Sequence, residues 1–281
     1  MTKIAYCLMV HKNPNQVAQL FKRIYTKEDF FHFQIFQTKD TPPMNVWRDA
    51  LSIEDKKNAF LFSNYKGSRC TFKQVEAILE TMKFFQSHQY DYFIDLSGQC
   101  YPLKPIESIK KELGGANVAY LHHYPLPTKN LHNGGLDRIY NYWFNINEFW
   151  IPFPKIQKYL PYDLKPYAGS NWFCLPKRFV DYALSYIIDH PKLIPYFSHS
   201  YCSDEIFFQT ILMNSPLRFE VVNDNKRYID WTKRGGPVPN VLTSEDFPKL
   251  MKSGMWFARK FDMNVDSAVL DGIDRNIMNS Q

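Results

Sequence analysis

The stretch Ile4-Ala5-Tyr6-Cys7-Leu8-Met9-Val10 is apolar throughout and predicts a buried strand near the start of the chain. Asn13 and Pro14 follow it, and this pair is typical of a helix start, because Asn caps a first turn and Pro fits the first helical position. The next apolar residues recur at helical spacing: Val17, Leu20, Phe21 and Ile24. The chain therefore opens with a strand, a short loop that carries His11, and a helix.

Strands and helices keep alternating through the first half of the chain. Further strands are predicted at 31–36, 59–62 and 92–96. Thr71 and Gln74 have the spacing of a capping box at the start of another helix. This alternation predicts an α/β fold in which a mostly parallel sheet has helices on both faces. One domain, 1–281, is expected, since no internal repeat, low-complexity segment or break in composition divides the chain.

Polar residues lie at the carboxyl ends of the predicted strands, where parallel sheets bind ligands. These residues are His11, Gln37, Arg69 and the run Ser97-Gly98-Gln99. Together they outline a nucleotide pocket. The chain nevertheless has neither of the common phosphate-binding fingerprints, G-x-G-x-x-G or the Walker loop.

The second half of the chain has a less regular pattern. Residues 120–166 are rich in Tyr, Trp, Pro and His without a clean period, which predicts long loops with short elements, the usual location of an acceptor site. Beyond them we expect strands at 169–175, 219–222 and 227–231, and helices at 176–188 and 244–252. A polar tail is expected to end the chain.

The composition narrows the classes of function only slightly. A net charge of +6 and a pI of about 8.9 fit an anionic ligand or an anionic membrane surface. Basic residues are interleaved with acidic ones and form no block, so a nucleic-acid binder is kept only as the weaker alternative. Aromatic residues make up 17% of the chain, which suits sugar stacking as well as an ordinary core.

The cysteines and histidines form no disulfide or metal pattern. The five cysteines are odd in number and widely spread without a C-x-x-C, which indicates reduced thiols in a cytosolic setting. His122, His123 and His132 are the nearest approach to a metal cluster, but no Cys or carboxylate stands at ligand spacing, so no metal site is expected. The N-terminus does not resemble a signal peptide, and no stretch approaches the ~20 apolar residues of a membrane span.

Two adjacent carboxylates, Asp204 and Glu205, stand at the start of an apolar helical pattern in the stretch 201–209. Ser203 is expected to cap this helix, with both acids in its first turn, where the helix dipole favours negative charge. Helix capping alone would explain the pair. Neighbours on a helix do not face each other, whereas the two carboxyls of a glycosidase stand about 5 Å or more apart across the scissile bond. Only one of the two is therefore expected to do chemistry.

Six stretches follow one another along the chain: AYCLMVH (5–11), LSGQCYPL (96–103), GSNWF (169–173), DEIFFQT (204–210), RYIDW (227–231) and FARKFD (257–262). Together they resemble the core-2/I-branching glycosyltransferase family, with its peptide O-xylosyltransferase relatives, over nearly the whole chain. The resemblance implies a GT-A-type fold with a Rossmann-like central sheet. It also implies an inverting transfer of a sugar, N-acetylglucosamine or xylose in the well-known members, from a UDP-sugar to a hydroxyl.

The resemblance further implies that the enzyme needs no metal ion or other cofactor, and the chain contains no Asp-x-Asp, the usual metal–diphosphate motif. It divides the single domain into a mainly nucleotide-sugar-binding half, 1–115, a mainly acceptor-binding and catalytic half, 116–270, and the tail, 271–281. The expected partners are a nucleotide sugar and a glycan or lipid-linked glycan acceptor, without nucleic acid.

The resemblance assigns roles to individual residues. Glu205 matches the catalytic base, which would take the proton of the attacking sugar hydroxyl. Lys260 matches the lysine that contacts the UDP diphosphate, where positive side chains stabilise the charge of the leaving group. The partner arginine of the family has no clear match. Its candidates stay open: Arg227, Lys233, Arg234 and Arg259.

Other residues are expected to line the two substrates. Besides Lys260, the expected donor-binding residues are Val10, His11, Gln37, Arg69, Arg227, Ile229 and Arg259. The expected acceptor-binding residues are Trp172, Asp204 and Trp231. For both tryptophans a place in the core stays open as the alternative to sugar stacking.

Two positions depart from the family pattern. Gln37 and Cys100 stand where members commonly carry an aspartate, so the identity of the donor sugar stays open. The membrane anchor and luminal disulfides of vertebrate relatives are absent, which points to a bacterial-type cytoplasmic enzyme of surface polysaccharide synthesis, with peripheral attachment to the inner face of the membrane left open. A non-catalytic nucleotide- or glycan-binding protein on the same fold is the alternative.

Overall fold

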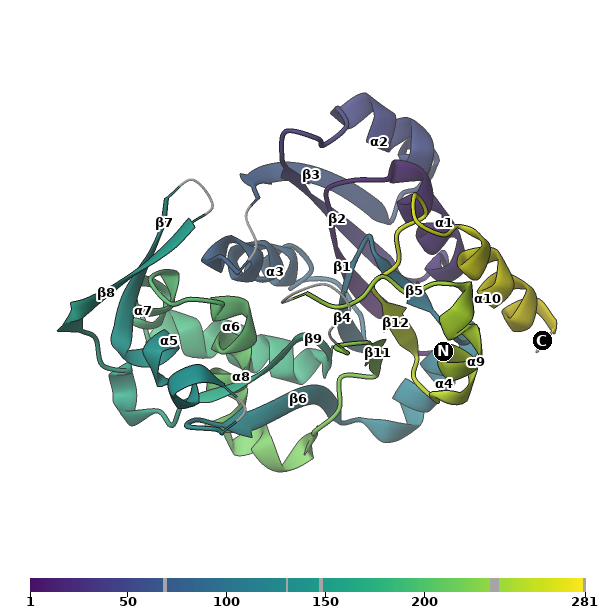
Figure 1. Ribbon diagram of the computed structural model, residues 1–281. Coiled ribbons are helices and arrows are strands. Elements are labelled where there is room, and N and C mark those ends of the chain that lie inside the picture. The colour runs from purple at the N-terminus through teal and green to yellow at the C-terminus, as the bar shows by residue number, and fades with distance from the viewer. Residues whose placement is uncertain (68–69, 130, 147–148, 233–237, 280–281) are drawn as a thin grey trace. The chain divides into compact units, whose positions relative to one another are not determined.

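The structure is a computed structural model that describes residues 1–67, 70–129, 131–146, 149–232 and 238–279 (Figure 1). The chain forms two compact units, each built from segments that are distant in sequence. The first unit comprises Met1–Asn64, Tyr90–Asn117 and Lys226–Gln281. The second unit comprises Tyr65–Gln89 and Val118–Asn225. One of the points where the chain passes from one unit to the other lies between Asn117 and Val118.

The first unit is organised around the predicted N-terminal strand. Its main strands lie in the order β4-β1-β2-β3, and β1 runs parallel to both β2 and β4. Their bounds are β1 Ile4–Val10, β2 Phe30–Gln37, β3 Ala59–Lys66 and β4 Tyr92–Ser97. Every residue of β1 is buried, which explains why the strand is apolar on both faces. The helices of this part are α1 Pro14–Ile24, α2 Met44–Leu51 and α4 Ile106–Ala116.

A small second sheet completes the first unit. Its strands are β5 Cys100–Pro102, β11 Arg227–Ile229 and β12 Phe257–Arg259, in the order β11-β12-β5. The C-terminal part of the chain also forms two helices, α9 Phe247–Lys252 and α10 Ala268–Asn279. The expected polar tail is therefore wrong as far as Asn279, because α10 buries Val269, Leu270, Ile273 and Ile277.

The second unit pairs β6 Ala119–Pro125 antiparallel with β9 Tyr167–Pro176 and parallel with β10 Val221–Val222. Its helices are α3 Phe72–Phe84, α5 Leu136–Tyr140, α6 Lys177–Asp189, α7 Leu193–Ser198 and α8 Phe207–Met213. Gly169 is needed where β6 bulges toward β9, since a Cβ there would lie 1.9 Å from the carbonyl oxygen of His122. That glycine therefore serves the packing of the two strands.

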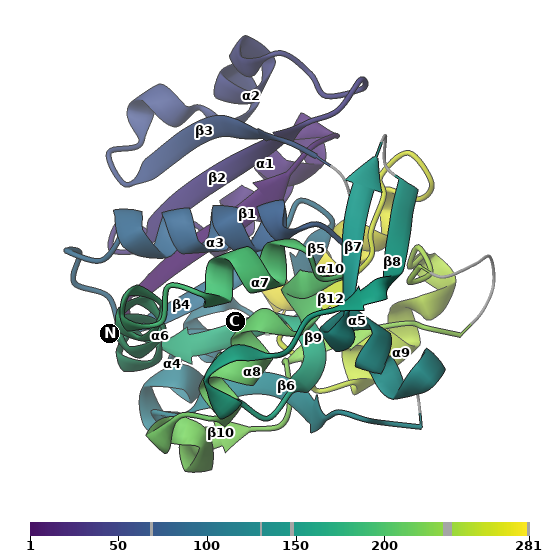
Figure 2. The same cartoon turned by 90° about the vertical axis from the view of Figure 1, so that its left-hand side faces the viewer.

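A hairpin occupies much of the region for which we expected long loops. Strands β7 Asn141–Ile146 and β8 Phe149–Gln157 pair antiparallel, with Phe144 opposite Ile151 and Ile146 opposite Phe149. Prolines within β8 obscure its strand pattern in the sequence, because a proline inside a run argues against a strand. Figure 2 shows this hairpin as a separate two-stranded element beside α5.

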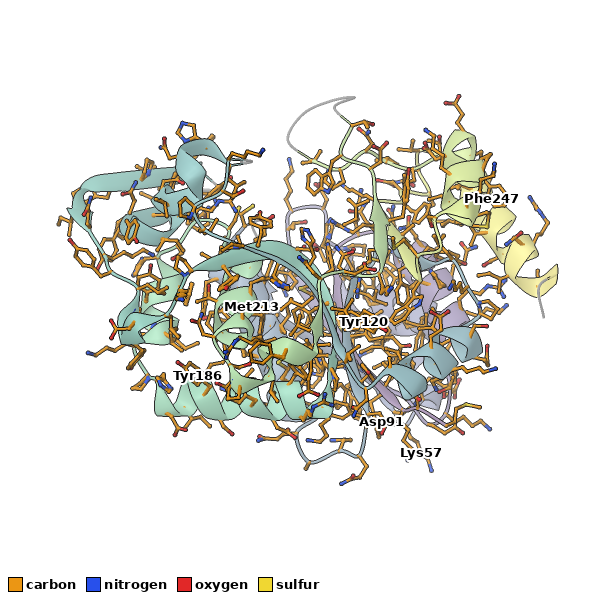
Figure 3. All side chains as sticks on the ribbon, turned by 90° about the horizontal axis from the view of Figure 1, so that it is seen from below. Lys57, Asp91, Tyr120, Tyr186, Met213 and Phe247 are labelled. Atoms are coloured by element: carbon orange, nitrogen blue, oxygen red, sulfur yellow. The ribbon has the colours of Figure 1, made fainter. Side chains whose placement is uncertain are left out.

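The α/β fold class, with a mostly parallel sheet and flanking helices, is confirmed. Many of the aromatic residues lie in the two cores, where Tyr6 stacks on Phe31 at 5.0 Å and Phe173 meets Phe208 edge-on at 5.1 Å. In Figure 3 side chains fill the space between the strands and helices of each unit, while the labelled Lys57 points outward. Among the described residues, no helix combines the length and the apolar character needed to cross a membrane.

Several local expectations need correction. The side chains of Asn13 and Thr71 make no helix-capping hydrogen bond, although α1 and α3 begin next to them. Helix α2 was not predicted. The strand expected at 219–222 is reduced to Val221–Val222, because Pro216–Glu220 forms a 3₁₀ helix.

Candidate functional site

The two adjacent carboxylates lie in one turn of 3₁₀ helix, Ser203–Glu205, which precedes α8. We had expected Ser203 to cap the helix, but the cap of this turn is Cys202. Cys202 adopts a left-handed conformation, with φ 48°, and its backbone N–H donates to the carbonyl of Cys70 at 3.2 Å. In turn the N–H of Glu205 donates to the carbonyl of Cys202 at 3.0 Å. The backbone on both sides of Cys202 therefore holds the turn in place.

The turn gives its two acids opposite environments. Asp204 is only 6% exposed, whereas the side chain of Glu205 is 33% exposed. Burial, and then the charge of Glu205, raise the pKa of Asp204 well above its ordinary value. Its closest polar contact is the Nδ2 of Asn171, at 3.4 Å from its Oδ2. Burial thus disfavours the charged form of Asp204, and Glu205 is the more exposed of the two acids.

Arg138, on α5, is paired with Glu205. Its Nη1 donates to Glu205 Oε2 at 2.7 Å, and its guanidinium lies over the ring of Tyr201, 5.5 Å from the centroid. Although burial by itself would lower it, the pKa of Arg138 is raised by the negative charge of Glu205. Within the described chain the other carboxylate oxygen, Oε1, accepts no hydrogen bond, so it can meet a hydroxyl of a substrate.

Sequence reasoning did not find Arg138, which lies 67 positions before Glu205 in a region without a clear period. It also missed Tyr124, at the end of β6. Burial and then the charge of Glu205 raise the pKa of this phenol, which therefore lies within electrostatic reach of the carboxylate. No local pattern in the sequence connects these three residues.

Trp172 does not face this site, because its indole is only 3% exposed within β9. Of the alternatives left open for it, the structure favours a place in the core. Trp231, which follows β11 in the first unit, is 59% exposed and offers a ring face to solvent. Its exposure suits stacking on a sugar.

In the first unit, basic side chains gather where β1 and β12 end. Burial, then the positive charges of Lys12 and Lys260, lower the pKa of His11, so both ammonium groups lie close to this imidazole. Lys12 also pairs with Asp262, Nζ to Oδ2, at 2.5 Å. Sequence reasoning omitted Lys12, although its position next to His11 was a usable signal.

A network of buried amides holds the segment that carries Lys260. Gln16 Nε2 donates to the carbonyl of Gly98 at 2.8 Å, and its Oε1 accepts from the N–H of Met263 at 2.8 Å. Gln99 Nε2 donates to the carbonyl of Phe261 at 3.1 Å. The run Ser97-Gly98-Gln99, which we placed at the pocket, therefore supports the neighbouring backbone.

The departure at Cys100 is also internal to the fold. Cys100 is fully buried, and its Sγ accepts from the backbone N–H of Ser97 at 3.4 Å. Gly98 packs against α1, where a Cβ would lie 2.7 Å from Val17 Cγ2. Gln37, the other departure, is exposed at the end of β2 and donates from Nε2 to Ser63 Oγ at 2.9 Å.

Arg227, one candidate for the partner arginine, is committed to the core. Its side chain is fully buried, donates from Nη2 to the carbonyl of Asp95 at 2.8 Å, and lies 3.7 Å from the Asp95 carboxylate. Releasing it would leave a buried charge unpaired, so we remove it from the expected donor-binding residues. Arg259 and Ile229 are half-buried, and Val10, at 1% exposure, can offer only its backbone. Arg69, Lys233 and Arg234 lie outside the described residues.

A family model described as Core-2/I-Branching enzyme matches residues 4–251. Xylosyltransferase 2 of Rattus norvegicus is 24% identical over 309 residues, covering 100% of this chain and 34% of the relative. Xylosyltransferase 2 of Homo sapiens is 24% identical, covering 99% of this chain and 34% of the relative. Xylosyltransferase oxt of Drosophila pseudoobscura pseudoobscura is 24% identical, covering 95% of this chain and 32% of the relative. The chain thus spans about a third of the length of these relatives.

Proposed function

Because the chain belongs to the Core-2/I-branching enzyme family, a family of glycosyltransferases, we propose that it transfers a sugar from a UDP-sugar to a hydroxyl of a glycan acceptor. The observation that carries this proposal is the pairing of Arg138 with a half-exposed Glu205 on a turn fixed by its backbone. A carboxylate that is partly exposed and held by an ion pair suits the proposed role of general base.

In the proposed reaction Glu205 Oε1 accepts the proton of the acceptor hydroxyl while the hydroxyl oxygen attacks the anomeric carbon. The bond from that carbon to the UDP oxygen breaks on the opposite face, so the configuration inverts. Arg138 holds the carboxylate through Oε2. Asp204, buried beside it, is proposed to bind the acceptor or to shape the turn, and not to act as a second base.

The leaving UDP gains negative charge as the bond breaks, and fixed positive groups must stabilise it. We assign this role to Lys260, with Lys12 as a second ammonium group and His11 near both. Burial is the main cause of the lowered pKa of His11, and the charges of Lys12 and Lys260 add to it, which supports a position of both ammonium groups near this imidazole. In this proposal the two lysines serve in place of a metal ion, in line with the lack of Asp-x-Asp in the chain.

The donor and acceptor are proposed by class. The similar proteins are xylosyltransferases, which favours a xylose donor for this chain, and the family resemblance leaves N-acetylglucosamine as the other proposed donor. The acceptor is proposed to be a glycan or a lipid-linked glycan, in bacterial surface polysaccharide synthesis at the cytoplasmic side of a membrane. An exposed Trp231 would stack on one of the sugars.

The test is a transfer assay with a panel of UDP-sugars in EDTA, together with calorimetric binding of UDP. Glu205→Gln should keep the affinity for UDP and lose turnover by about 10²- to 10⁴-fold, since a general base contributes this much. Glu220→Gln is the matched control, because Glu220 forms a similar pair with Arg178 at 2.6 Å on an exposed surface of the same unit. Equal turnover of Glu205→Gln and wild type would refute the assignment of the base, and binding of UDP-sugars without any transfer would favour the non-catalytic alternative.

A further inference from the structure

The hairpin β7–β8 and the residues just after it expose an unusual amount of apolar surface. Its large side chains are 42% to 76% exposed. They are Phe144, Ile146, Phe149, Ile151, Phe153, Ile156 and Tyr159. Single exposed apolar residues are common on soluble proteins, but contiguous patches of this kind mark interaction surfaces.

The register of the hairpin separates its side chains onto two faces, because directly opposite residues share a face. Tyr142 opposes Phe153, Phe144 opposes Ile151 and Ile146 opposes Phe149, and these three pairs form what we call the outer face. At the base of this face the rings of Tyr142 and Phe144 lie 5.9 Å and 5.2 Å from that of His199, so its most exposed part is nearer the tip. Trp143 and Trp150 lie on the inner face, with ring centroids 5.0 Å and 5.5 Å from that of Tyr201. The inner face therefore packs on the residue that lies under Arg138.

The hairpin is fixed firmly to its unit, so the outer face is presented in a defined orientation. Trp143 donates from its backbone N–H to the carbonyl of His199 at 3.0 Å and from Nε1 to the carbonyl of Asp137 at 2.9 Å. At the base of the hairpin, Lys158 is buried and donates from Nζ to the carbonyls of Tyr196 and His199 at 3.0 Å and 2.9 Å. Figure 1 shows the hairpin extending away from α8 and β9 of the same unit.

Three features favour a lipid surface over a protein as the partner of the outer face. The phenol of Tyr142 is the only polar side-chain group among its six residues, whereas a protein interface usually has about one hydrogen bond per 100–200 Å². Prolines at 152 and 154 remove backbone donors from β8 and so oppose the addition of a strand from a second copy. The chain carries a net charge of +6, which complements an anionic surface.

We propose that the outer face of the β7–β8 hairpin docks the protein on a bilayer of anionic phospholipid, with Ile146, Phe149 and Ile151 entering the interfacial layer. An apolar element combined with positive protein charge is the usual requirement for such peripheral binding. The inference adds a partner to the proposed function, because a lipid-linked acceptor would lie in the same bilayer. It does not depend on sugar transfer, and its test uses no sugar.

The experiment is flotation of the full chain with large unilamellar vesicles, either of phosphatidylglycerol and phosphatidylethanolamine or of phosphatidylcholine alone. Wild type should float with the anionic vesicles, more weakly as salt is raised. The double variant Phe149→Ser, Ile151→Ser should lower the partition coefficient at least about tenfold, since two large apolar side chains no longer enter the bilayer. Both residues are exposed, so the variant should fold, which circular dichroism checks.

The matched control is the double variant Phe219→Ser, Ile188→Ser, whose side chains are 81% and 73% exposed elsewhere in the same unit. It should bind vesicles like wild type. Failure of wild type to float with anionic vesicles would overturn the proposal, as would equal losses in both double variants. A wild-type dimer in sedimentation equilibrium that only the hairpin variant dissociates would overturn it in favour of a second copy of the chain. Glu205→Gln should float like wild type even if it is inactive, because the bilayer contact does not depend on the catalytic carboxylate. The two proposals can therefore fail independently.

Discussion

Replacing Lys158 with methionine should change how the stability of the protein depends on pH. Lys158 is only 4% exposed, and its Nζ donates to the carbonyls of Tyr196 and His199 and to Ser200 Oγ. No salt bridge joins it to a carboxylate among the described residues, and burial lowers its pKa to about 7. The ring of Tyr196, 4.3 Å away, and the three oxygen acceptors favour the ammonium form and limit this shift.

The sign follows from proton binding. An unfolded lysine keeps its proton up to a pKa of about 10.4, whereas the folded Lys158 releases it near 7, so the unfolded state binds more protons between these values. The folded state therefore gains stability as pH rises from 7 toward 10, by up to about 1.4 kcal/mol per pH unit. From pH 7 to 9 the full effect would be about 2–3 kcal/mol.

Urea unfolding of wild type and Lys158→Met at pH 7, 8 and 9 measures this effect. The methionine variant leaves the oxygen acceptors unpaired, which is a cost that does not vary with pH in this range, and all other groups titrate in both proteins. The free energy of unfolding of wild type minus that of the variant should therefore increase with pH. A difference that stays constant from pH 7 to 9 would refute the reasoning and show that the buried amine remains charged.

Three further predictions concern the site and the strands beside it. Arg138→Gln should lower kcat at least about tenfold with an unchanged affinity for UDP, and Arg138→Lys should restore part of the loss, which steady-state kinetics and calorimetry can check. Lys260→Ala and Lys12→Ala should each weaken UDP binding by about 10- to 100-fold in EDTA, as loss of a charge-assisted hydrogen bond implies. The control Lys104→Ala, which breaks an ion pair with Glu112 outside the candidate site, should not weaken it, and equal affinities in all three variants would dismiss the assignment. Gly169→Ala should lower the free energy of unfolding by about 3 kcal/mol, because its Cβ would overlap the carbonyl of His122, and an unchanged urea midpoint would contradict this.

Much of the fold follows from short-range patterns in the sequence. The apolar run of β1 requires burial on both faces, and the spacing of Val17, Leu20 and Ile24 determines which side of α1 is buried. Residues 206–212 likewise combine helical spacing with apolar side chains, and Ile206, Phe207, Ile211 and Leu212 are all buried as expected. Patterns of this kind are reliable because burial of apolar area is the dominant favourable contribution to folding.

Local patterns did not predict the hairpin β7–β8 or the helix that ends the chain. The hairpin leaves its outer face in solvent, so its apolar residues do not alternate with polar ones as in an ordinary half-buried strand. The C-terminal helix has polar residues between its buried positions, and its apolar pattern covers only a short stretch, so the sequence was interpreted as a polar tail. In both cases the tertiary neighbours, and not the local composition, decide the element.

For the candidate site, the sequence by itself pointed to Glu205 and Lys260, since both lie in stretches that resemble one family in the right order. The family model includes Glu205 and ends before Lys260. Only the tertiary structure separated the roles of the two adjacent acids, by burying Asp204 and pairing Glu205 with Arg138. It also withdrew Arg227, whose guanidinium neutralises Asp95 inside the core. Charge and burial depend on neighbours distant in the chain, and a residue's type and spacing carry no information about them.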